Sequence, residues 1–322
     1  MTRFDGAVAT LAIATRSGLD ESVHHGAGAA LRADGTIGAS IGDPGLVVYP
    51  RSCLKPLQTH AMVDLGLDLP DELLAVTCAS HDGSPEHLSA VRSILDRYGL
   101  AESDLANTPA RPYGSGARSA ARAAGMPPTS LQQNCSGKHA AMLATCRIRG
   151  WPIEGYVEAD HPLQLAIVRG IESLGVTVHH VGVDGCGAPT HALSLTDLAR
   201  AFAVLAAPRS LIARAMSSHP VMVAGPTRDV TLWMQALPTL IAKEGAAGMM
   251  AAALSDGRAI AFKVADGSDV ARQAVLPEAL RAAGVDVDSE ARDLVERVAV
   301  PVLGHGQPVG RLRALEWTPC SS

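Results

Sequence analysis

Apolar residues recur along the chain with two different spacings, and the first of them is typical of strands. Ala7–Thr15 is a short, mainly apolar segment with enough alternation to predict a strand. Val23–Arg32 and Thr36–Ile41 repeat this pattern on either side of Asp34-Gly35, a pair that favours tight turns. The N-terminal part of the chain is therefore predicted to form a strand followed by a hairpin.

Helical spacing takes over in the middle of the chain. Helices are predicted over 52–66, from Pro70, and over 84–99, 136–150, 161–171, 196–206, 209–217, 228–242 and 268–283. Residues 100–133 are irregular and rich in Pro, Gly and Ser. The strand pattern returns at Arg258–Ala265 and Val309–Trp317. Strands at both chain ends with helices between them indicate an α+β fold, in which the N- and C-terminal segments form one antiparallel sheet with a helical layer inserted. We predict one globular domain over residues 1–322.

Composition narrows the possible classes of function. Aromatic residues make up only 3% of the chain and the net charge is −5, which argues against a nucleic-acid surface. No apolar run is long enough for a membrane helix, and Met1–Asp5 does not resemble the start of a signal peptide. We therefore expect a cytoplasmic protein whose six cysteines are reduced.

Ser52 and Lys55 lie three residues apart at the start of the first predicted helix. This spacing places both side chains on one face. A partly buried ammonium at the positive end of a helix loses proton affinity, and a neutral lysine can then take a proton from a serine. Acyl-transfer enzymes use this Ser-x-x-Lys arrangement. The alternative for this pair is a serine that caps the helix and a lysine that is solvated. The preceding residue, Arg51, is either a clamp for a substrate carboxylate or an exposed charge.

Lysine is rare in this chain. Only four of the 27 basic residues are lysines, namely Lys55, Lys138, Lys243 and Lys263. Arginine does not lose its proton near neutral pH, whereas a buried lysine can, so the few lysines are candidates for titratable amines. By position alone, Lys243 is a charge at a helix C-terminus. Lys263 lies on a predicted strand and is expected to point to solvent.

Two cysteines are predicted to lie in polar loops, whereas Cys53, Cys78 and Cys146 fit the core. Cys135 comes just before a predicted helix, and Cys186 is in a glycine-rich loop. Thiolates are good zinc ligands, so these two cysteines indicate either a zinc site or two free thiols. The neighbours that would complete or surround a zinc site are Lys138, His139 and Asp184.

Six segments follow one another in a fixed order: RSCLKP, CASH, NCSGKHAAMLA, DGCGAP, HPVMVAG with a following arginine, and AKEGAAG. Together they resemble the thermolabile, inducible rhizobial-type L-asparaginase family (asparaginase II), over roughly residues 10–317. The most specific segments are NCSGKH and DGC. The family fold is similar to that of serine-dependent β-lactamases and glutaminases, which agrees with the predicted α+β architecture.

The resemblance also implies roles for individual residues. It implies two Ser–Lys pairs, Ser52 with Lys55 and Ser80 with Lys243, although spacing alone makes Ser80 an ordinary loop serine. It further implies a zinc ion held by Cys135, Lys138 and Cys186, with His139 and Asp184 around it. We predict that Arg51, His139 and Asp184 bind the substrate.

The function expected from these residues is the hydrolysis of L-asparagine to L-aspartate and ammonia. Ser52 would attack the side-chain carbonyl, while Ser80 and Lys243 would relay the proton to the leaving ammonia. A homodimer is expected. The open alternatives are a glutaminase or β-lactam hydrolase with the same Ser–Lys chemistry, a zinc-hydroxide amidohydrolase, and a non-catalytic protein that binds zinc or an amino acid.

Overall fold

The computed structural model describes residues 4–320, which divide into two compact units. The first unit contains the chain up to Cys53, the segment Ala192–Ala207 and everything from Leu232 onward. The second contains Leu54–His191 and Pro208–Thr231. The chain therefore passes from one unit to the other at four points. The single domain over residues 1–322 stays a prediction.

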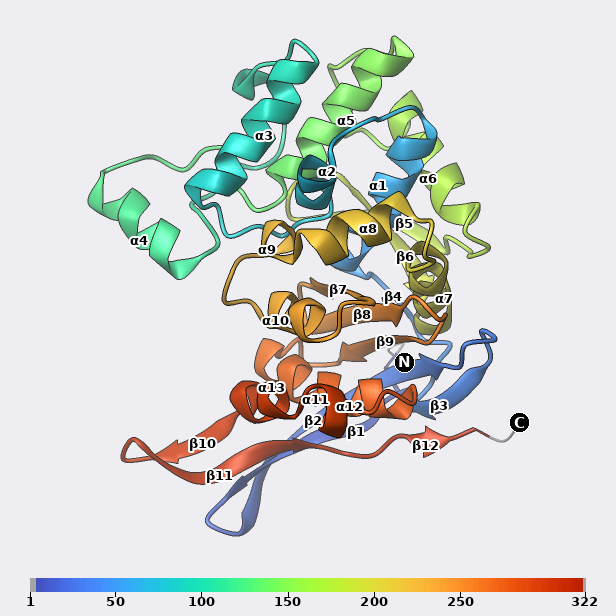
Figure 1. Cartoon of the computed structure of the whole chain (residues 1–322), viewed down its shortest axis with the longest axis vertical. Helices are drawn as coiled ribbons and strands as arrows, with labels where there is room; N and C mark the ends of the chain where they lie inside the picture. Colours follow the sequence, from blue (N-terminus) through green and yellow to red (C-terminus); the bar gives the residue numbers. More distant parts are fainter. Residues whose placement is uncertain (1–3, 321–322) are drawn as a thin grey trace. The chain divides into compact units, whose positions relative to one another are not determined.

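The first unit is built on an antiparallel sheet whose strands come from both ends of the chain (Figure 1). The strands run in the order β10-β11-β1-β2-β9-β8-β7, and β3 pairs with both β2 and β12. C-terminal strands thus flank the N-terminal β1 and β2 on both sides, which confirms the predicted α+β architecture. The bounds are β1 Ala9–Arg16, β2 Leu19–Leu31, β3 Ile37–Ile41, β7 Leu240–Gly245, β8 Met249–Leu254, β9 Ala259–Val264, β10 Pro301–Gly304, β11 Gln307–Ala314 and β12 Thr318–Pro319.

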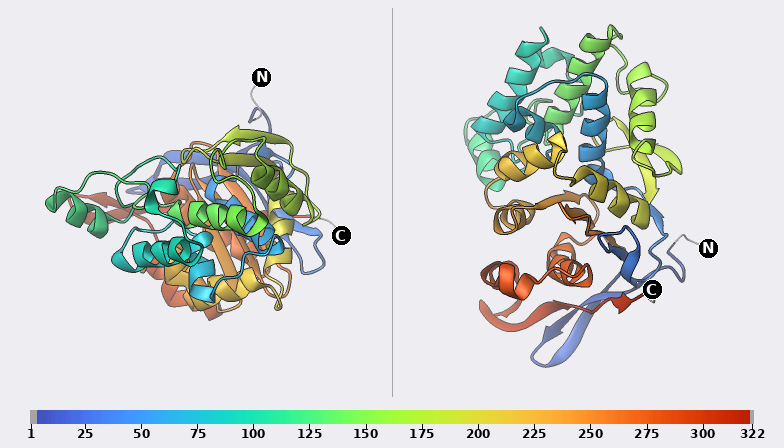
Figure 2. Two further views of the ribbon diagram at one scale, coloured as in Figure 1. Left: turned by 90° about the horizontal axis from the view of Figure 1, so that it is seen from above. Right: turned by 45° about the vertical axis from the view of Figure 1, so that its right-hand side comes forward.

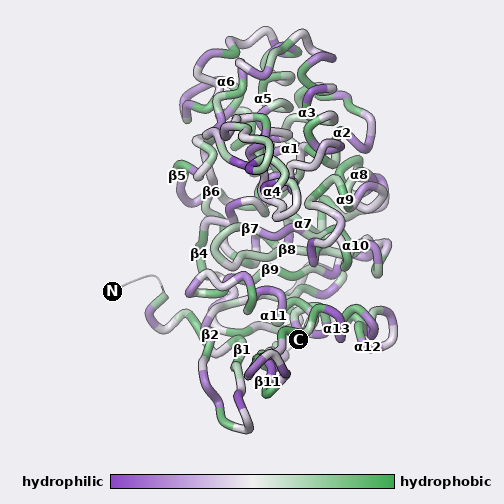
Figure 3. Tube along the Cα trace, turned by 90° about the vertical axis from the view of Figure 1, so that its left-hand side faces the viewer, coloured by the Kyte–Doolittle hydropathy of each residue, from purple (hydrophilic) through white to green (hydrophobic). Residues whose placement is uncertain are grey.

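Helices cover the central strands of this sheet. Helix α7 (Leu195–Leu205) packs on β2, β8 and β9, and α11 (Asp269–Ala282) contacts β1, β2, β9 and β11. Every residue of β7, β8 and β9 is buried, so both faces of these strands lie in the core. Two short helices, α12 (Val287–Glu290) and α13 (Arg292–Val298), follow α11, and hydrophilic and hydrophobic residues alternate along them (Figure 3).

The second unit consists mainly of helices. Helix α1 packs against α5 and α6, and α2 packs against α3, α5 and α8 (Figure 2). Ser84 caps α3 by accepting a hydrogen bond from the His87 backbone N–H, and Pro85 follows it, as predicted. The bounds are α1 Lys55–Asp64, α2 Asp71–Thr77, α3 Pro85–Arg97, α4 Ser115–Ala123, α5 Ser136–Arg149, α6 Pro162–Glu172, α8 Leu211–Ser218 and α9 Pro220–Val223.

Short elements complete the chain. A 3₁₀ turn at Arg51–Leu54 leads directly into α1. The predicted helix start near Ser52 is therefore confirmed, but its first turn is a 3₁₀ turn and not an α-helical one. In the second unit, β5 (His180–Val183) and β6 (Pro189–Ser194) form a hairpin. In the first unit, β4 (Val47–Val48) pairs with the last residues of β6.

The predicted helix over 228–242 is wrong in its second half. Helix α10 spans only Asp229–Ala236, and the chain then enters β7, which carries Lys243. Lys243 is therefore a strand residue and not a charge at a helix C-terminus. Strands β7 and β8 are buried on both faces and show no period-two alternation, so their sequences gave no strand signal. The stretch 100–133 contains α4, which was not predicted.

The expectation that Lys263 points to solvent is also wrong. Lys263 lies on the central strand β9 and is 8% exposed. Its amine donates hydrogen bonds to the backbone carbonyls of Ala247, at 2.7 Å, and of Val264. Burial lowers the pKa of this amine. A lysine can occupy a central strand here because the turn between β7 and β8 and the end of β9 offer it carbonyl acceptors.

None of the helices in residues 4–320 combines the length and the hydrophobicity that crossing a lipid bilayer would require.

Candidate functional site

Lys55 and Ser80 touch each other inside the second unit. The Lys55 Nζ atom lies 3.2 Å from Ser80 Oγ, and it also donates to the carbonyls of Ala79, at 2.5 Å, and Asn134, at 3.4 Å. Lys55 is 1% exposed and Ser80 is 4% exposed. Two backbone carbonyls thus hold the amine in place, and its remaining hydrogen-bonding position faces the serine hydroxyl. The resemblance implied Ser80 as the partner of Lys243, but here Ser80 contacts Lys55. The pairing of Ser52 with Lys55 stays a prediction.

Neighbouring backbone contacts hold Ser80 in place. The Ser80 N–H donates to the carbonyl of Val223, and the His81 N–H donates to the carbonyl of Asn134. The buried His81 ring contacts Ser136 Oγ, the first residue of α5, at 2.8 Å through Nε2. Burial, together with nearby His87 and Lys55, holds the pKa of His81 well below its ordinary value. Ser80 is therefore tied through His81 to the loop that carries Cys135.

Cys135, Lys138 and Cys186 lie together in the second unit, as the resemblance implied. Lys138 Nζ is 3.3 Å from Cys186 Sγ, and the Cys186 thiol hydrogen-bonds to Cys135. All three side chains are buried. Helix α5 presents Lys138 one turn after Cys135, and the turn between β5 and β6 brings Cys186 to them.

The pKa values of the two thiols are shifted in opposite directions. The pKa of Cys135 is lowered well below its ordinary value by the hydrogen bond from Cys186, and the Lys55 and Lys138 ammonium groups lower it further. The pKa of Cys186 is raised because it supplies that hydrogen bond and because it is buried. Burial acts to lower the pKa of Lys138, but both thiols and Asp184 outweigh this and raise it. Cys135 is thus biased toward the thiolate form by the two neighbouring amines and by Cys186.

His139 and Asp184 border this cluster. The His139 Nδ1 atom lies 2.8 Å from the Tyr156 hydroxyl, and no partner of its Nε2 atom is found among residues 4–320. Asp184 is partly exposed, and its Oδ1 atom accepts a hydrogen bond from the Gly185 N–H at 2.8 Å. Both side chains lie beside the cluster and stay candidates for substrate contact.

Ser52, Arg51 and Lys243 belong to the first unit. The thiol of Cys53, the residue after Ser52, donates to the Lys243 carbonyl at 3.0 Å. The 3₁₀ turn that carries Ser52 therefore lies against the strand that carries Lys243. Arg51 has a φ of 55°, a left-handed conformation that costs a residue other than glycine energy. Such strain is common at functional positions.

Glu244 is a buried residue of this region that the sequence did not single out. Lys243 is completely buried, and its Nζ atom lies 3.0 Å from Glu244 Oε1 and 2.9 Å from the Glu244 carbonyl. A buried amine needs such partners to stay charged. The only available signal was the neighbouring carboxylate in the sequence Lys243-Glu244, which reads as an ordinary pair of surface charges.

Comparison with known proteins identifies the family. A family model described as L-asparaginase II matches residues 12–314. The chain belongs to the L-asparaginase II family. It is therefore a hydrolase that acts on amide C–N bonds, and asparagine is the substrate that the family implies.

Two further comparisons add little to this assignment. A solved structure of a β-lactamase from Mycobacterium bovis is 17% identical, and the match covers 81% of this chain and 95% of that one at a TM-score of 0.41. No curated protein matches the chain.

Arg228, in the segment that follows HPVMVAG, binds a carboxylate of the asparaginase chain itself. Its Nη1 atom lies 3.1 Å from Asp82 Oδ1, and its guanidinium lies 4.6 Å from the centre of the Tyr113 ring. Gly225 permits this contact, because a Cβ there would lie 2.0 Å from Asp82 Oδ2. Arg228 thus fixes the residue two positions after Ser80.

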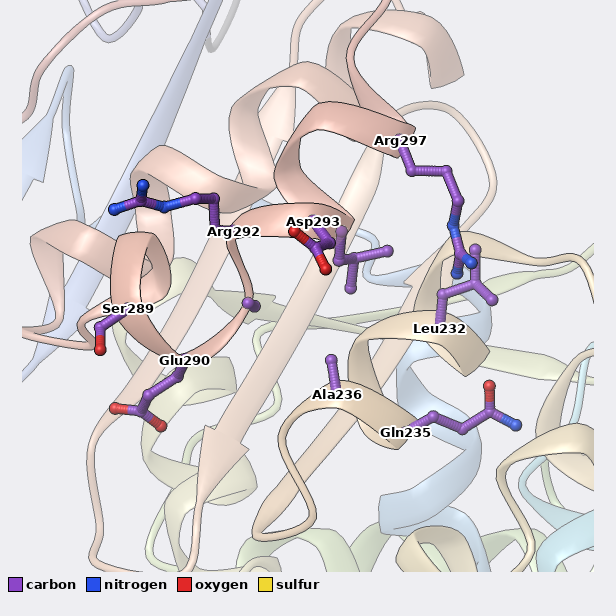
Figure 4. Close-up of a pocket in the computed structure, with 10 residues that line it drawn as sticks. Leu232, Gln235, Ala236, Ser289, Glu290, Arg292, Asp293 and Arg297 are labelled. Carbon is purple, nitrogen blue, oxygen red and sulfur yellow. The ribbon is translucent and has the colours of Figure 1, made fainter.

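A separate cavity of about 460 Å³ lies in the first unit, where α10 faces α12 and α13 (Figure 4). Charged residues of both signs line it, among them Glu290, Arg292, Asp293 and Arg297. It contains no candidate site residue, so it is not part of the asparaginase site.

Proposed function

We propose that this member of the L-asparaginase II family hydrolyses L-asparagine to L-aspartate and ammonia by Ser–Lys acyl transfer. The observation that carries the proposal is the contact of 3.2 Å between Lys55 Nζ and Ser80 Oγ in a buried setting. A lysine amine placed beside a serine hydroxyl, with its other N–H groups held by carbonyls, can pass protons to and from that hydroxyl.

Ser52 is proposed as the nucleophile because it lies three residues before Lys55 along the chain. Lys55 takes the Ser52 proton as Oγ attacks the side-chain amide carbon of asparagine. Ser80 donates its proton to the departing ammonia and regains one from protonated Lys55, to which it is hydrogen-bonded, which leaves an ester of Ser52 and a neutral Lys55. Water then attacks the ester, and the proton that water loses returns to Ser52 as aspartate leaves. Lys243 is proposed to support this relay.

Substrate recognition is proposed for three residues. Arg51 is suited to bind the α-carboxylate, because guanidinium and carboxylate groups form strong charge-assisted hydrogen bonds. His139 offers a buried Nε2 atom for which residues 4–320 provide no partner, and Asp184 offers a partly exposed carboxylate for the α-amino group.

Cys135, Lys138 and Cys186 are proposed to hold a zinc ion. The donor set fits such an ion, since Cys186 contacts both Lys138 and Cys135 and Cys135 is biased toward thiolate. No cluster of three or more His, Cys, Asp or Glu side chains suited to a metal is found within residues 4–320, so the third protein ligand would have to be the amine. Zinc bound there would supply Lewis-acid polarisation and would fix the Cys135 and Cys186 loops.

The expected homodimer and cytoplasmic location stay predictions.

Three other functions would give different results in the same assays. A glutaminase would prefer glutamine, and a β-lactam hydrolase would prefer β-lactams. A zinc-hydroxide amidohydrolase would lose all activity with chelators but tolerate the loss of Ser52. A binding protein would bind asparagine without releasing ammonia.

The test is ammonia release from asparagine and from glutamine by the wild type, Ser52→Ala and Ser80→Ala, with Ser93→Ala as a matched surface control. We expect Ser52→Ala to lower kcat by about a thousandfold or more and Ser80→Ala by about a hundredfold. Ser93 lies on the exposed side of α3 and should have no effect. Unchanged turnover by Ser52→Ala would overturn the nucleophile assignment.

A further inference from the structure

Lys243 and Glu244 form a buried ion pair in the first unit. Lys243 Nζ lies 3.0 Å from Glu244 Oε1 and donates to the Glu244 carbonyl at 2.9 Å. The two residues are 0% and 5% exposed. Adjacent residues of a strand normally point to opposite faces, so the flexible lysine chain bends back to reach its neighbour. Glu244 takes no part in the acyl-transfer steps proposed for Ser52, Lys55 and Ser80.

A second positive charge lies near this pair. Arg272, on α11, is 2% exposed, and its Nη1 atom lies 3.9 Å from the sulfur of Met250. Met250 is the residue of β8 that pairs with Glu244 in the sheet, and residues paired in this way share one face. The Arg272 Nε atom also lies 3.5 Å from Asp269 Oδ1. Arginine keeps its proton near neutral pH, so its charge favours the ionised form of the Glu244 carboxyl group.

The thiol of Cys53 also lies beside the pair, and it donates to the Lys243 carbonyl at 3.0 Å. Burial raises the pKa of this thiol to about 12, although Lys243 and Arg272 act in the opposite direction. Cys53 is therefore uncharged near neutral pH. The negative charge next to Lys243 is that of Glu244.

Close packing connects the pair to the turn that carries the proposed nucleophile. Cys53 directly follows Ser52, and Gly245 directly follows Glu244. A Cβ at Gly245 would lie 2.3 Å from the Pro50 carbonyl oxygen. The backbone that carries the ion pair is therefore held against the turn that carries Ser52.

We propose that Glu244 is a positioning residue of the asparaginase reaction, which holds the Lys243 amine in one place and in its charged form. This inference rests on the proposed function, in which Lys55 is the amine that takes the serine proton. A buried amine without a carboxylate partner loses its proton readily, because burial disfavours a charge. A Lys243 that stays charged cannot accept the serine proton, so it supports the relay by donating hydrogen bonds.

The charge of Lys243 can be measured directly, because the chain contains only four lysines. Nuclear magnetic resonance of the full chain, labelled with ¹³C at the lysine Cε atoms, distinguishes an ammonium group from a neutral amine. The signal that is lost in Lys243→Arg, and in Lys243→Met, belongs to Lys243. In the wild type we expect this signal to keep its ammonium shift from about pH 6 to about pH 9. In Glu244→Gln we expect the neutral amine at about pH 8.

The pH profile of ammonia release separates positioning from a purely structural role. The kcat of Glu244→Gln should fall at least about tenfold relative to the wild type between about pH 6 and about pH 8, as the lysine loses its charge, with a smaller change in KM. Glu244→Asp keeps a carboxylate and should restore most of this loss. Glu296→Gln, at an exposed position of α13, is the matched control and should change neither the signal nor kcat.

Circular dichroism and thermal melting check that each variant is folded, and the wild-type signal decides the charge even where a variant is too unstable to study. A neutral Lys243 in the wild type at about pH 7, or an ammonium signal that Glu244→Gln leaves unchanged, would overturn the proposal. A pH profile of folded Glu244→Gln parallel to that of the wild type would overturn it as well. Failure of the proposed function is a different result, namely undiminished turnover by Ser52→Ala.

Discussion

At the scale of single residues, the asparaginase site depends on where a few amines lie. The rarity of lysine made all four lysines candidates, and the resemblance implied roles for Lys55, Lys138 and Lys243. All three are buried. What the sequence could not show is that Lys55 Nζ meets Ser80 Oγ, because these residues are 25 positions apart and meet only through the packing of α1 against the segment after α2. The proposed pairing of Ser80 with Lys243 stays a prediction.

Substitutions of Arg51 are expected to affect protein stability and substrate binding differently. Its φ of 55° costs about 1 kcal/mol for arginine and little for glycine. Arg51→Gly should therefore keep or slightly raise stability in urea unfolding, while the KM for asparagine rises about tenfold because the carboxylate clamp is lost.

Arg51→Ala serves as the matched control, because alanine keeps the strained backbone but lacks the guanidinium. It should raise KM as much as glycine does without the gain in stability. An unchanged KM in both variants would show that Arg51 does not bind substrate.

At the scale of elements, the helices were easier to predict than the strands. Ser84 with Pro85 and the glycine at 150 mark the ends of α3 and α5 by local chemistry, so these helices were placed correctly. Strands β7 and β8 were missed since their residues, such as Met249–Leu254, are apolar on both faces. Only the neighbouring strands distinguish such a run from a buried helix.

Close packing of two elements in the first unit makes Gly245 a sensitive position. A Cβ at Gly245 would lie 2.3 Å from the Pro50 carbonyl oxygen and 3.2 Å from Cys53 Sγ. Gly245→Ala should therefore push the 3₁₀ turn carrying Ser52 away from β7 and lower kcat at least about tenfold, with a loss of stability. The measurement is ammonia release beside thermal melting.

Gly116→Ala in α4 is the control, because its Cβ would meet nothing within 4 Å and its backbone needs no positive φ. It should stabilise the protein by about 0.5–1 kcal/mol without changing turnover. If Gly245→Ala behaved like Gly116→Ala, the close contact between β7 and the turn would have no role in positioning Ser52.

At the scale of the whole molecule, buried histidines make stability depend on pH. The pKa values of His81, His87 and His139 are lowered chiefly by burial, and that of His191 is lowered to about 4. In the unfolded chain these rings titrate near an ordinary value of about 6.5. As pH falls below that value the unfolded state takes up protons that the folded state does not, so the free energy of unfolding decreases.

We therefore expect full stability above about pH 6.5 and a progressive loss toward pH 4, to which His191 alone contributes about 3 kcal/mol. Urea unfolding at a series of pH values measures this slope. His87→Gln should make the slope shallower, because the amide does not titrate. A free energy of unfolding that stays constant between about pH 7 and pH 5 would contradict the assignment of neutral buried histidines.

The most direct test of the account is the rate of ammonia release from asparagine by Lys55→Arg, compared with the wild type. Arginine keeps the positive charge and can still donate to the carbonyls of Ala79 and Asn134, but it cannot give up its proton near neutral pH. If Lys55 works by accepting and returning the serine proton, kcat should fall by about a thousandfold in a protein that remains folded. Turnover close to that of the wild type would contradict Ser–Lys catalysis in this chain.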